Sequence, residues 1–350
     1  LLELAELLAC PVVDLGGRFN FPGGHPLDLT ACREEALREA DLVLALDVYD
    51  LASALSSSML RERTGAHLAV PTDAKIAHIT LGDFLYSSWV TDVQKLLPVD
   101  LPIAGDSALA LPELVRLCQI EMRAGPVSLD RIEERRQRVQ ELHENASARF
   151  REATQQAWPA RPMSALRVYG ELWELIREED WALVNGQYGA IRQSWDFREP
   201  AQFAGSPRGA GLGYALGASL GGALAHKGSG RICIDIQGDG DFLYTPSALW
   251  TAVNCQIPLL IVLLNNRSYG NDERHQEHMA ITRGRPVENK GVGIHLTSPE
   301  TDFATLARSF QVAGFGPIED PEALRPVLAE AIKVVKSGRP ALVDVVTRLG

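Results

Sequence analysis

The sequence has few cysteines, no long apolar run and no excess of positive charge. Its five cysteines, an odd number, show no Cys-x-x-Cys spacing, which excludes a disulfide-rich secreted scaffold and favours reduced thiols in an intracellular protein. The longest apolar run near the middle, residues 257–264, has eight residues, whereas a membrane-spanning helix needs about twenty. We therefore expect a cytoplasmic protein that does not cross a membrane.

The charge balance is acidic. There are 34 Lys and Arg against 45 Asp and Glu, a net charge of -11, which disfavours binding to nucleic acid or to an anionic membrane. Hydrophobic residues make up 46% of the 350 residues, so the chain can build cores, and its length predicts two domains. The chain begins at Leu1 without a methionine or a signal-peptide pattern, and we expect it to be a piece of a longer protein.

Hydrophobic periodicity divides the chain into three parts. Residues 1–118 alternate helical patterns with short β-rich runs, which predicts a small parallel α/β domain. Residues 119–163 lose the β signal and carry both charge signs on a helical period; a solvated helical linker explains them better than a nucleic-acid-binding face. From 164 to 350 the α/β alternation resumes. The predicted fold class is α/β, with two doubly wound parallel-sheet domains joined by a helical linker.

Individual elements follow from the same patterns. In the first domain, strands are expected at 11–15, 42–46, 67–70 and 75–80, and a helix at 30–40. In the second domain, strands are expected at 181–184, 231–236, 258–264 and 341–346, with Ser164 as the N-cap of a helix and a crossover helix at 245–255. The strands at 231–236 and 258–264 are apolar enough to be central strands covered on both faces.

Polar residues follow two of these strands where each one ends. Gln237-Gly238-Asp239-Gly240-Asp241 comes directly after the strand that ends at Ile236, and Asn265-Asn266 follows the next strand. One crossover helix separates them, so a carboxylate and an amide oxygen 27 positions apart fall at one edge of the sheet. With a backbone carbonyl such as that of Ser268, they form the hard-oxygen set that Mg²⁺ prefers, and the glycine amides can face a diphosphate. Either motif alone would be a plain loop.

This combination resembles a known signature. Gly238-Asp239-Gly240, 24 further residues and then Asn265-Asn266 resemble the cofactor signature of thiamine diphosphate-dependent enzymes. Residues 247–252 and 265–270 look most like the benzoylformate decarboxylase and acetolactate synthase types. The resemblance implies a central domain at 1–118 and a diphosphate-binding domain at 164–350.

The resemblance also implies roles for individual residues. Asp239 and Asn266 would bind Mg²⁺ through their side chains and Ser268 through its carbonyl. Leu212 would hold the cofactor in a bent shape, and the carbonyl of Ala210 would accept from its 4'-amino group. The implied cofactor-binding residues are Gln187, Ala210, Leu212, Gly238, Asp239, Gly240, Asp241, Phe242, Asn266, Ser268, Tyr269 and Gly270.

Three points stay open in this interpretation. Tyr188, next to Gln187, stands where the family often has histidine. The glycine-rich segment 209–214 would be read as a dinucleotide loop, but Tyr214 occupies the position of the third glycine, and tight helix packing also explains it. His275 and His278 would serve substrate binding or proton transfer, or simply lie on a solvated helix face; two nitrogen ligands make a weak zinc case.

The implied function is a thiamine diphosphate- and Mg²⁺-dependent 2-oxo acid decarboxylase or carboligase. The family's activating glutamate lies on a separate pyrimidine-binding domain, and nothing in residues 1–350 matches it. We therefore expect this chain to be inactive alone, to need that domain or subunit, and to form a homodimer or homotetramer. The alternatives are a lyase branch acting on an acyl-CoA and a non-catalytic nucleotide-binding relative. Some synthase relatives carry FAD, but residues 1–118 show no motif for it.

Overall fold

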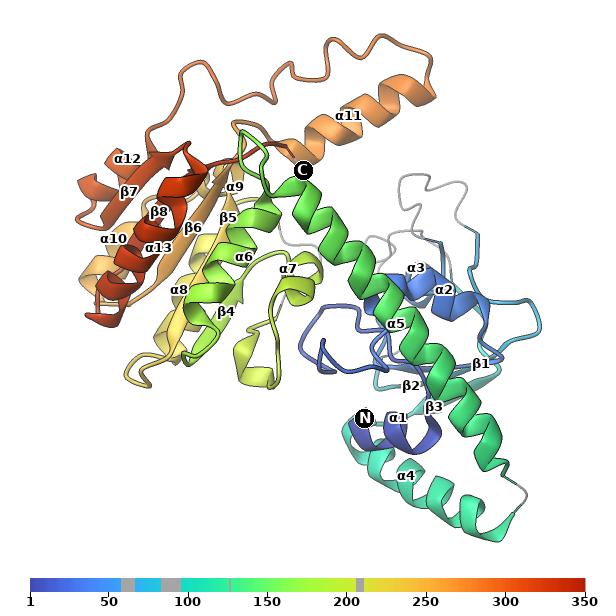
Figure 1. The fold of residues 1–350 in the computed structure, drawn as a ribbon. Coiled ribbons are helices and arrows are strands. Elements are labelled where there is room, and N and C mark those ends of the chain that lie inside the picture. Colours follow the sequence, from blue (N-terminus) through green and yellow to red (C-terminus); the bar gives the residue numbers. More distant parts are fainter. Residues whose placement is uncertain (58–66, 83–95, 126, 206–210, 350) are drawn as a thin grey trace. The chain divides into compact units, whose positions relative to one another are not determined.

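The computed structural model describes residues 1–57, 67–82, 96–125, 127–205 and 211–349 (Figure 1). The chain divides into two compact units: unit 1 comprises Leu1–Leu15 and Gly24–Arg149, and unit 2 comprises Gly16–Gly23 and Phe150–Gly350. The division falls within one long helix, α5 (Leu129–Ala157). The domain boundaries expected from the sequence lie at residues 118 and 163. They follow the domains of the family that the sequence resembles, and they differ from the boundary between the compact units.

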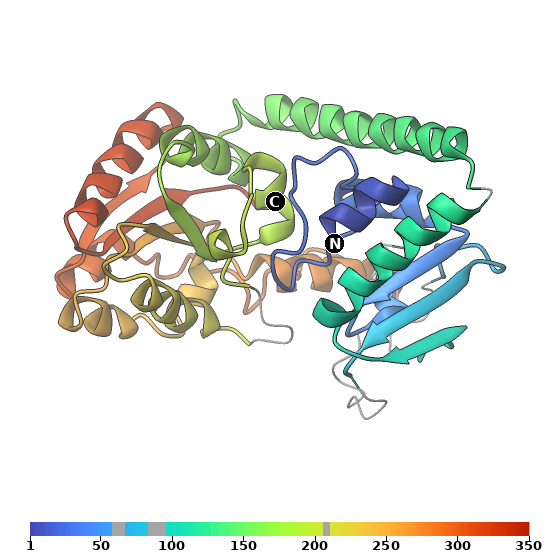
Figure 2. The ribbon, with the colours of Figure 1, turned by 90° about the horizontal axis from the view of Figure 1, so that it is seen from below.

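Unit 1 is a small parallel sheet with helices. Its three strands are β1 (Leu42–Leu46), β2 (Lys75–Thr80) and β3 (Leu101–Ala104), and they pair in that order. The helices α1 and α4 contact each other, and α4 lies against β2, as Figure 2 shows with the strands in blue to teal. The helical elements are α1 (Leu2–Leu8), the 3₁₀ turn η1 (Thr30–Cys32), α2 (Arg33–Arg38), α3 (Leu51–Ala54) and α4 (Ser107–Ala124).

The predictions for this unit are partly confirmed. β1 and β2 have the bounds expected at 42–46 and 75–80, and the helix expected at 30–40 is present as η1 followed by α2. The strands expected at 11–15 and 67–70 are wrong. Each is an isolated bridge, Val12 with Asp28 and Leu68 with Ser56. Neither segment continues far enough to build a ladder, because glycines follow the first and a proline follows the second.

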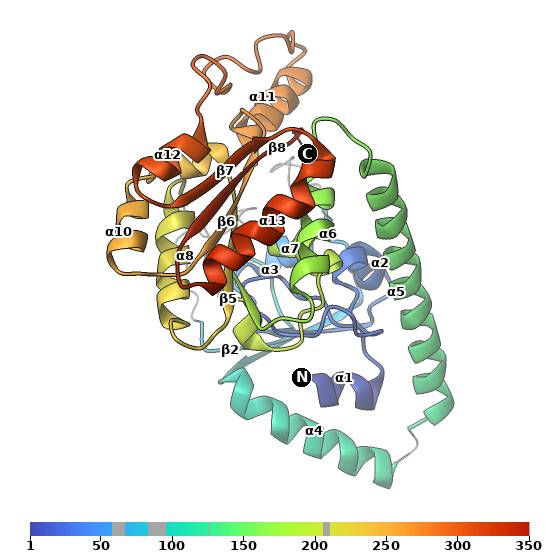
Figure 3. The ribbon, with the colours of Figure 1, turned by 60° about the vertical axis from the view of Figure 1, so that its left-hand side comes forward.

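Unit 2 contains the larger sheet. Five parallel strands lie in the order β4-β5-β6-β8-β7 (Figures 1 and 3). They are β4 (Trp181–Asn185), β5 (Ile232–Gly238), β6 (Leu260–Asn265), β7 (Ala313–Ile318) and β8 (Ala341–Val346). The helical elements are α6 (Ala165–Ile176), α7 (Tyr188–Ser194), η3 (Pro200–Gln202), α8 (Tyr214–Ala225), α9 (Asp239–Phe242), α10 (Ala248–Asn254), α11 (Gly270–Thr282), α12 (Phe303–Ser309) and α13 (Pro321–Lys336).

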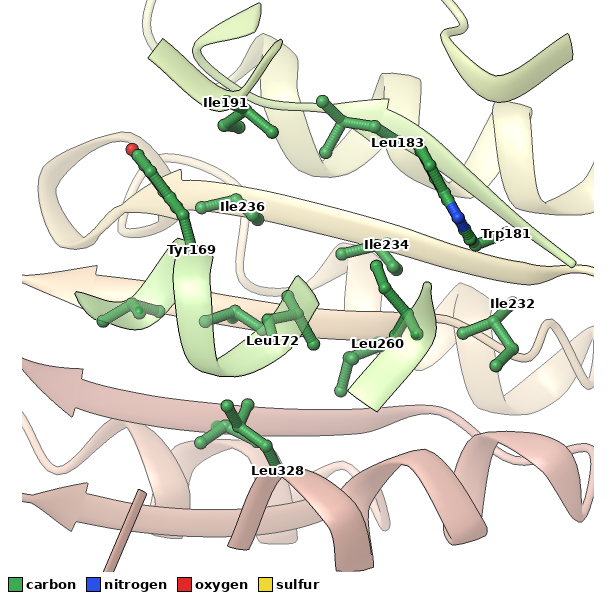
Figure 4. Close-up of a cluster of buried hydrophobic side chains, with 14 of the residues drawn as sticks. Tyr169, Leu172, Trp181, Leu183, Ile191, Ile232, Ile234, Ile236, Leu260 and Leu328 are labelled. Atoms are coloured by element: carbon green, nitrogen blue, oxygen red, sulfur yellow. The ribbon is translucent and has the colours of Figure 1, made fainter. Parts of the chain in front are cut away.

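Helices cover both faces of this sheet. On one face, residues of α6, α7 and α13 pack against Ile232, Ile234 and Ile236 of β5, and Figure 4 shows part of this cluster. On the other face, residues of α8, α10 and α12 pack against Cys233 and against Ile261 of β6. Side chains alternate between the faces of a strand, and burial of both faces explains why these strands are almost entirely apolar. The α/β doubly wound fold class is confirmed.

Most element predictions for unit 2 are also confirmed. The four expected strands are present as β4, β5, β6 and β8, and Ser164 caps α6, its Oγ accepting from the backbone N–H of Arg167 at 3.2 Å. β7 was not predicted, because its sequence, AGFGPI, contains two glycines and a proline. It is one of the two edge strands of the sheet, with an irregularity between Phe315 and Ile318. Among the helices that the structure describes, none combines the length and the apolarity that crossing a bilayer requires.

Candidate functional site

The candidate site lies where β5 and β6 end. These strands are parallel neighbours, and their register pairs Gly238 with Leu264. The chain continues from β5 directly into the short helix α9, which begins at Asp239, and from β6 into the turn at Asn266. The two motifs expected to meet are therefore side by side at the carboxyl edge of the sheet, as the parallel β-α-β connection requires.

Asp239 is the buried centre of this edge, with a side chain 1% exposed. Its Oδ1 accepts from the backbone N–H of Gly240 at 2.9 Å, whereas Oδ2 is buried with no hydrogen-bond partner among the described residues. Burial raises the pKa of Asp239 to about 6, although the nearby backbone N–H groups of Gly240, Arg267 and Ser268 act to lower it. A buried carboxylate oxygen without a partner is costly, and a cation would offset that cost.

The turn after β6 presents two further oxygens. Asn266 Oδ1 accepts from the backbone N–H of Ser268 at 3.0 Å, which closes the turn. Arg267 between them has a left-handed φ of 57°. The carbonyl of Ser268 accepts from the N–H of Gly270 at 2.8 Å and keeps a second lone pair. The turn after β6 thus carries an amide oxygen and a backbone carbonyl, two of the three oxygen ligands expected from the sequence, and it follows the strand next to the one that ends at Asp239.

The glycine-rich segment before α8 lies against the same edge. The N–H of Gly213 donates to Asp241 Oδ1, and its carbonyl accepts from Thr245 Oγ1 at 3.1 Å. Gly213 has a φ of 90°, a conformation that favours glycine. Leu212, beside it, leaves 48% of its surface exposed. Ala210, also expected here, lies outside the described residues.

The end of β4 approaches from the other side of β5. Asn185 Nδ2 donates to Asp235 Oδ1 at 2.9 Å, and Gln187 follows it as an exposed residue at the start of α7. Tyr188 does not share this exposure. Its ring is buried and stacks on Phe203 with 3.9 Å between centroids. The residue that stands where the family often has histidine is therefore part of the hydrophobic core.

The glycines at this edge differ in what surrounds them. A Cβ on Gly238 would meet nothing within 4 Å, whereas one on Gly240 would lie 2.5 Å from two ring carbons of Tyr269. A Cβ on Gly270 would lie 2.3 Å from a Leu349 methyl carbon. Gly238 thus borders open space, and the other two permit close packing.

Phe242, expected to line the approach to the diphosphate, has its side chain elsewhere. The ring is 0% exposed and packs edge-to-face on Phe303, with 5.8 Å between centroids. It belongs to the core between the sheet and α12. Only the backbone of Phe242, and not its ring, is therefore available for contact with a cofactor at the strand ends.

The two histidines singled out from the sequence lie on α11, where His275 is exposed and His278 half-buried. Sequence reasoning missed a nearer group, Glu273, in the first turn of the same helix. Its Oε2 accepts from Ser268 Oγ at 2.7 Å and lies 3.4 Å from His295 Nε2. Burial opposes ionisation of Glu273, but these partners and Lys290 outweigh it and lower the pKa. Only its position five residues after Ser268 could have drawn attention to it.

Two more carboxyl groups are buried below the edge. Asp235 accepts from Asn185 and Gln237, and burial raises its pKa to about 7; burial likewise raises that of Asp344, on β8, to about 6. Within the described ranges, no three His, Cys, Asp or Glu side chains gather as a metal-binding group. The candidate donor set contains a single carboxylate, with neutral oxygens for the rest, which suits Mg²⁺ accompanied by water and phosphate oxygens.

A protein-family model matches the part of the chain that carries this site. Residues 185–345 match the family model "Thiamine pyrophosphate enzyme, C-terminal TPP binding domain". The acetolactate synthase isozyme 3 large subunit of Escherichia coli (strain K12) is 26% identical over 357 residues, which cover 99% of this chain and 56% of that protein. Benzoylformate decarboxylase of Pseudomonas aeruginosa is 25% identical over 358 residues, which cover 99% of this chain and 58% of that protein. The chain therefore spans little more than half the length of these relatives.

Solved structures show the same fold. A benzoylformate decarboxylase from Polynucleobacter necessarius matches with a TM-score of 0.70 at 19% identity, covering 99% of this chain and 58% of that chain. A thiamine diphosphate-dependent 4-hydroxybenzoylformate decarboxylase from Rhodococcus jostii RHA1 matches with a TM-score of 0.66 at 20% identity and the same coverage. The resemblance noted in the sequence is confirmed: residues 185–345 match the C-terminal TPP-binding domain of thiamine pyrophosphate enzymes, and the chain is similar to acetolactate synthase and benzoylformate decarboxylase.

Proposed function

We propose that this chain forms the diphosphate- and metal-binding part of a thiamine diphosphate- and Mg²⁺-dependent enzyme that decarboxylates or ligates 2-oxo acids. One observation carries the proposal: Asp239 Oδ2 is buried without a partner in the described part of the chain, at the strand end where Asn266 and Ser268 present neutral oxygens. The names of the relatives, acetolactate synthase and benzoylformate decarboxylase, support the reaction class.

The residues at this edge fit the proposed ligands. Mg²⁺ would be held by the Asp239 carboxylate, Asn266 Oδ1 and the Ser268 carbonyl, leaving positions for water and diphosphate oxygens. The open space beside Gly238 gives the diphosphate room to approach the backbone. The remaining proposed cofactor contacts are Gln187, Ala210, Leu212, Gly240, Asp241, Phe242 through its backbone, Tyr269 and Gly270.

When bound, thiamine diphosphate supplies an electron sink for breaking or forming a bond next to a carbonyl. The chain's own residues then have three tasks. The Asp239 carboxylate offsets the charge of the metal. Leu212 and Tyr214, 48% and 42% exposed, offer apolar surface to the organic part of the cofactor. Gly213, through Asp241, holds this segment against α9.

A group outside residues 1–350 is part of the proposal. No residue here matches the family's activating glutamate, so we propose that a pyrimidine-binding domain, in the same protein or in a second subunit, supplies it. Residues 1–350 alone should then not turn over substrate. Assembly as a homodimer or homotetramer would be one way to complete the site.

The test uses the protein expressed from its complete gene. Calorimetric titration with thiamine diphosphate should give saturable binding in Mg²⁺ and none in EDTA, and Asp239→Asn should weaken binding at least tenfold while the melting temperature falls little or rises. Binding that is indifferent to both metal and Asp239 would refute the proposal. Release of CO₂ from a panel of 2-oxo acids then tests for decarboxylation, and the organic product separates the two activities, because a decarboxylase gives an aldehyde and a carboligase gives a 2-hydroxy ketone or 2-hydroxy acid.

A further inference from the structure

Asn265 links β6 to β8, and it also links both strands to the turn that carries the candidate metal ligands. It is the last residue of β6, and its side chain is 5% exposed. Its Nδ2 donates to Asp344 Oδ1 on the neighbouring strand β8 at 3.0 Å, and its Oδ1 accepts from the backbone N–H of Arg267 at 3.2 Å. One amide group is therefore bonded on both sides, to a fixed carboxylate and to the turn.

The turn needs such an anchor. Arg267 adopts a φ of 57°, which costs a residue with a side chain about 1 kcal/mol or more. The next hydrogen bond, from the N–H of Ser268 to Asn266 Oδ1, closes a second, overlapping turn. The directions of the Asn266 side chain and of the Ser268 carbonyl therefore both depend on where the N–H of Arg267 is held.

Asp344 is placed at a cost that sheet stability does not explain. It is 0% exposed in the middle of β8, between Val343 and Val345, and its Oδ2 has no hydrogen-bond partner among the residues described. An apolar side chain at this position would avoid the desolvation of a carboxyl group. The neighbouring strand β7 has a glycine, Gly316, opposite this side chain. A Cβ at that position would lie only 2.9 Å from the Cβ of Asp344, so the glycine leaves room for Asp344.

We propose that Asp344 is a positioning residue for the metal site: through Asn265, it fixes the turn at 265–268 in the orientation that presents Asn266 and Ser268 to the cation. The inference rests on the proposed function, since it concerns the same metal. It assigns Asp344 no contact with metal or cofactor.

The test measures metal affinity separately from folding. Full-length protein with saturating thiamine diphosphate is titrated with Mn²⁺, and free Mn²⁺ is followed by electron paramagnetic resonance. Asp344→Ala should raise the Kd for Mn²⁺ at least tenfold, with full binding restored at high metal. Asp344→Asn keeps an acceptor oxygen for Asn265 and should stay within threefold of the wild type. The proposal would be overturned if the Kd for Mn²⁺ rose equally in both variants, or if it rose in neither of them.

A double-mutant cycle tests the route through Asn265. Asn265→Ala alone should weaken Mn²⁺ binding about as much as Asp344→Ala, and the double variant should be no weaker than either, because both remove one link. Effects that multiply would mean that Asp344 acts by another route, which refutes the inference. If the melting curve shows that Asp344→Ala does not fold, Asp344→Thr replaces it. Its Kd for Mn²⁺ should also rise at least tenfold, because the threonine hydroxyl is one bond too close to the backbone to reach the position of Oδ1.

Measurements on the wild type distinguish failure of the proposed function from failure of the positioning role. A wild-type protein that binds no thiamine diphosphate with Mn²⁺ refutes the proposed function. Wild-type binding together with an unaltered Kd in folded Asp344→Ala or Asp344→Thr refutes the positioning role and leaves the proposed function intact.

Discussion

Gly238→Ala and Gly240→Ala form a matched pair that separates packing from ligand binding. Both glycines flank Asp239 at the end of β5, and each substitution adds one methyl group. The Cβ at position 238 would meet nothing within 4 Å, and its φ of -82° and ψ of 154° suit alanine. The Cβ at position 240 would lie 2.5 Å from the Cδ1 and Cε1 carbons of Tyr269.

The stability effects follow from these distances. Carbon atoms normally approach to about 3.5–4 Å, so the Tyr269 ring must withdraw by roughly 1 Å in Gly240→Ala. Overpacking of this kind costs about 1–3 kcal/mol, and since the ring is only half-buried, we expect a value near the lower end. Gly238→Ala should stay within about 0.5 kcal/mol, because glycine and alanine differ little in strain there.

The binding effects should have a different order. The methyl group of Gly238→Ala enters the open space proposed for the diphosphate, so its affinity for thiamine diphosphate in Mg²⁺ should fall at least tenfold without loss of stability. Melting curves should show a lower Tm by about 2–4 °C for Gly240→Ala and no such drop for Gly238→Ala. Unchanged affinity in Gly238→Ala would show that the diphosphate does not use this space, and an unchanged Tm in Gly240→Ala would show that Tyr269 yields without cost.

Two further predictions concern the sheet below the site. Burial raises the pKa of Asp235 from 3.8 to about 7, so the folded protein holds this proton more tightly than the unfolded chain, and this group's contribution to stability falls as pH rises from about 4 to about 7. One pH unit corresponds to about 1.4 kcal/mol, so the free energy of unfolding of Asp235→Asn relative to the wild type should rise by up to about 4 kcal/mol over that interval. Urea unfolding at several pH values measures this difference, and parallel stability curves for the two proteins would contradict the prediction. Leu328→Ala, in the core shown in Figure 4, should cost about 2–5 kcal/mol, whereas Leu224→Ala, at a position 52% exposed, should cost much less, and equal losses in Tm would contradict the core assignment.

Sequence patterns predicted the uninterrupted apolar strands well and the strands that contain proline or glycine poorly. β5, β6 and β8 are apolar throughout because both faces of the sheet are covered, so their own residues determine what they form. β3 and β7 contain proline or glycine and owe their conformation to the neighbour that they pair with. The segments 11–15 and 67–70 have suitable side chains, but in the described part of the chain each forms only a single bridge before glycine or proline follows.

The same distinction applies to the site. The proposed ligand types, Asp239, Asn266 and Ser268, could be read from local spacing, because a parallel β-α-β unit brings consecutive strand ends together. Their supports could not, because the link from Asn265 to Asp344 joins residues 79 positions apart and depends on β8 lying beside β6 rather than on any spacing.

One signal for these supports was nevertheless present in the sequence. Asp235 and Asp344 each interrupt a run of apolar residues that otherwise predicts a fully buried strand. A carboxyl group at such a position requires either a proton or a set of donors. Here the donors are amide groups: Asn185 of β4 and Gln237 of the same strand for Asp235, and Asn265 of β6 for Asp344. In a parallel sheet, side chains at the carboxyl ends of strands surround the bound ligand. An acid within an otherwise apolar central strand is therefore best examined as a support for the residues at the next strand's end.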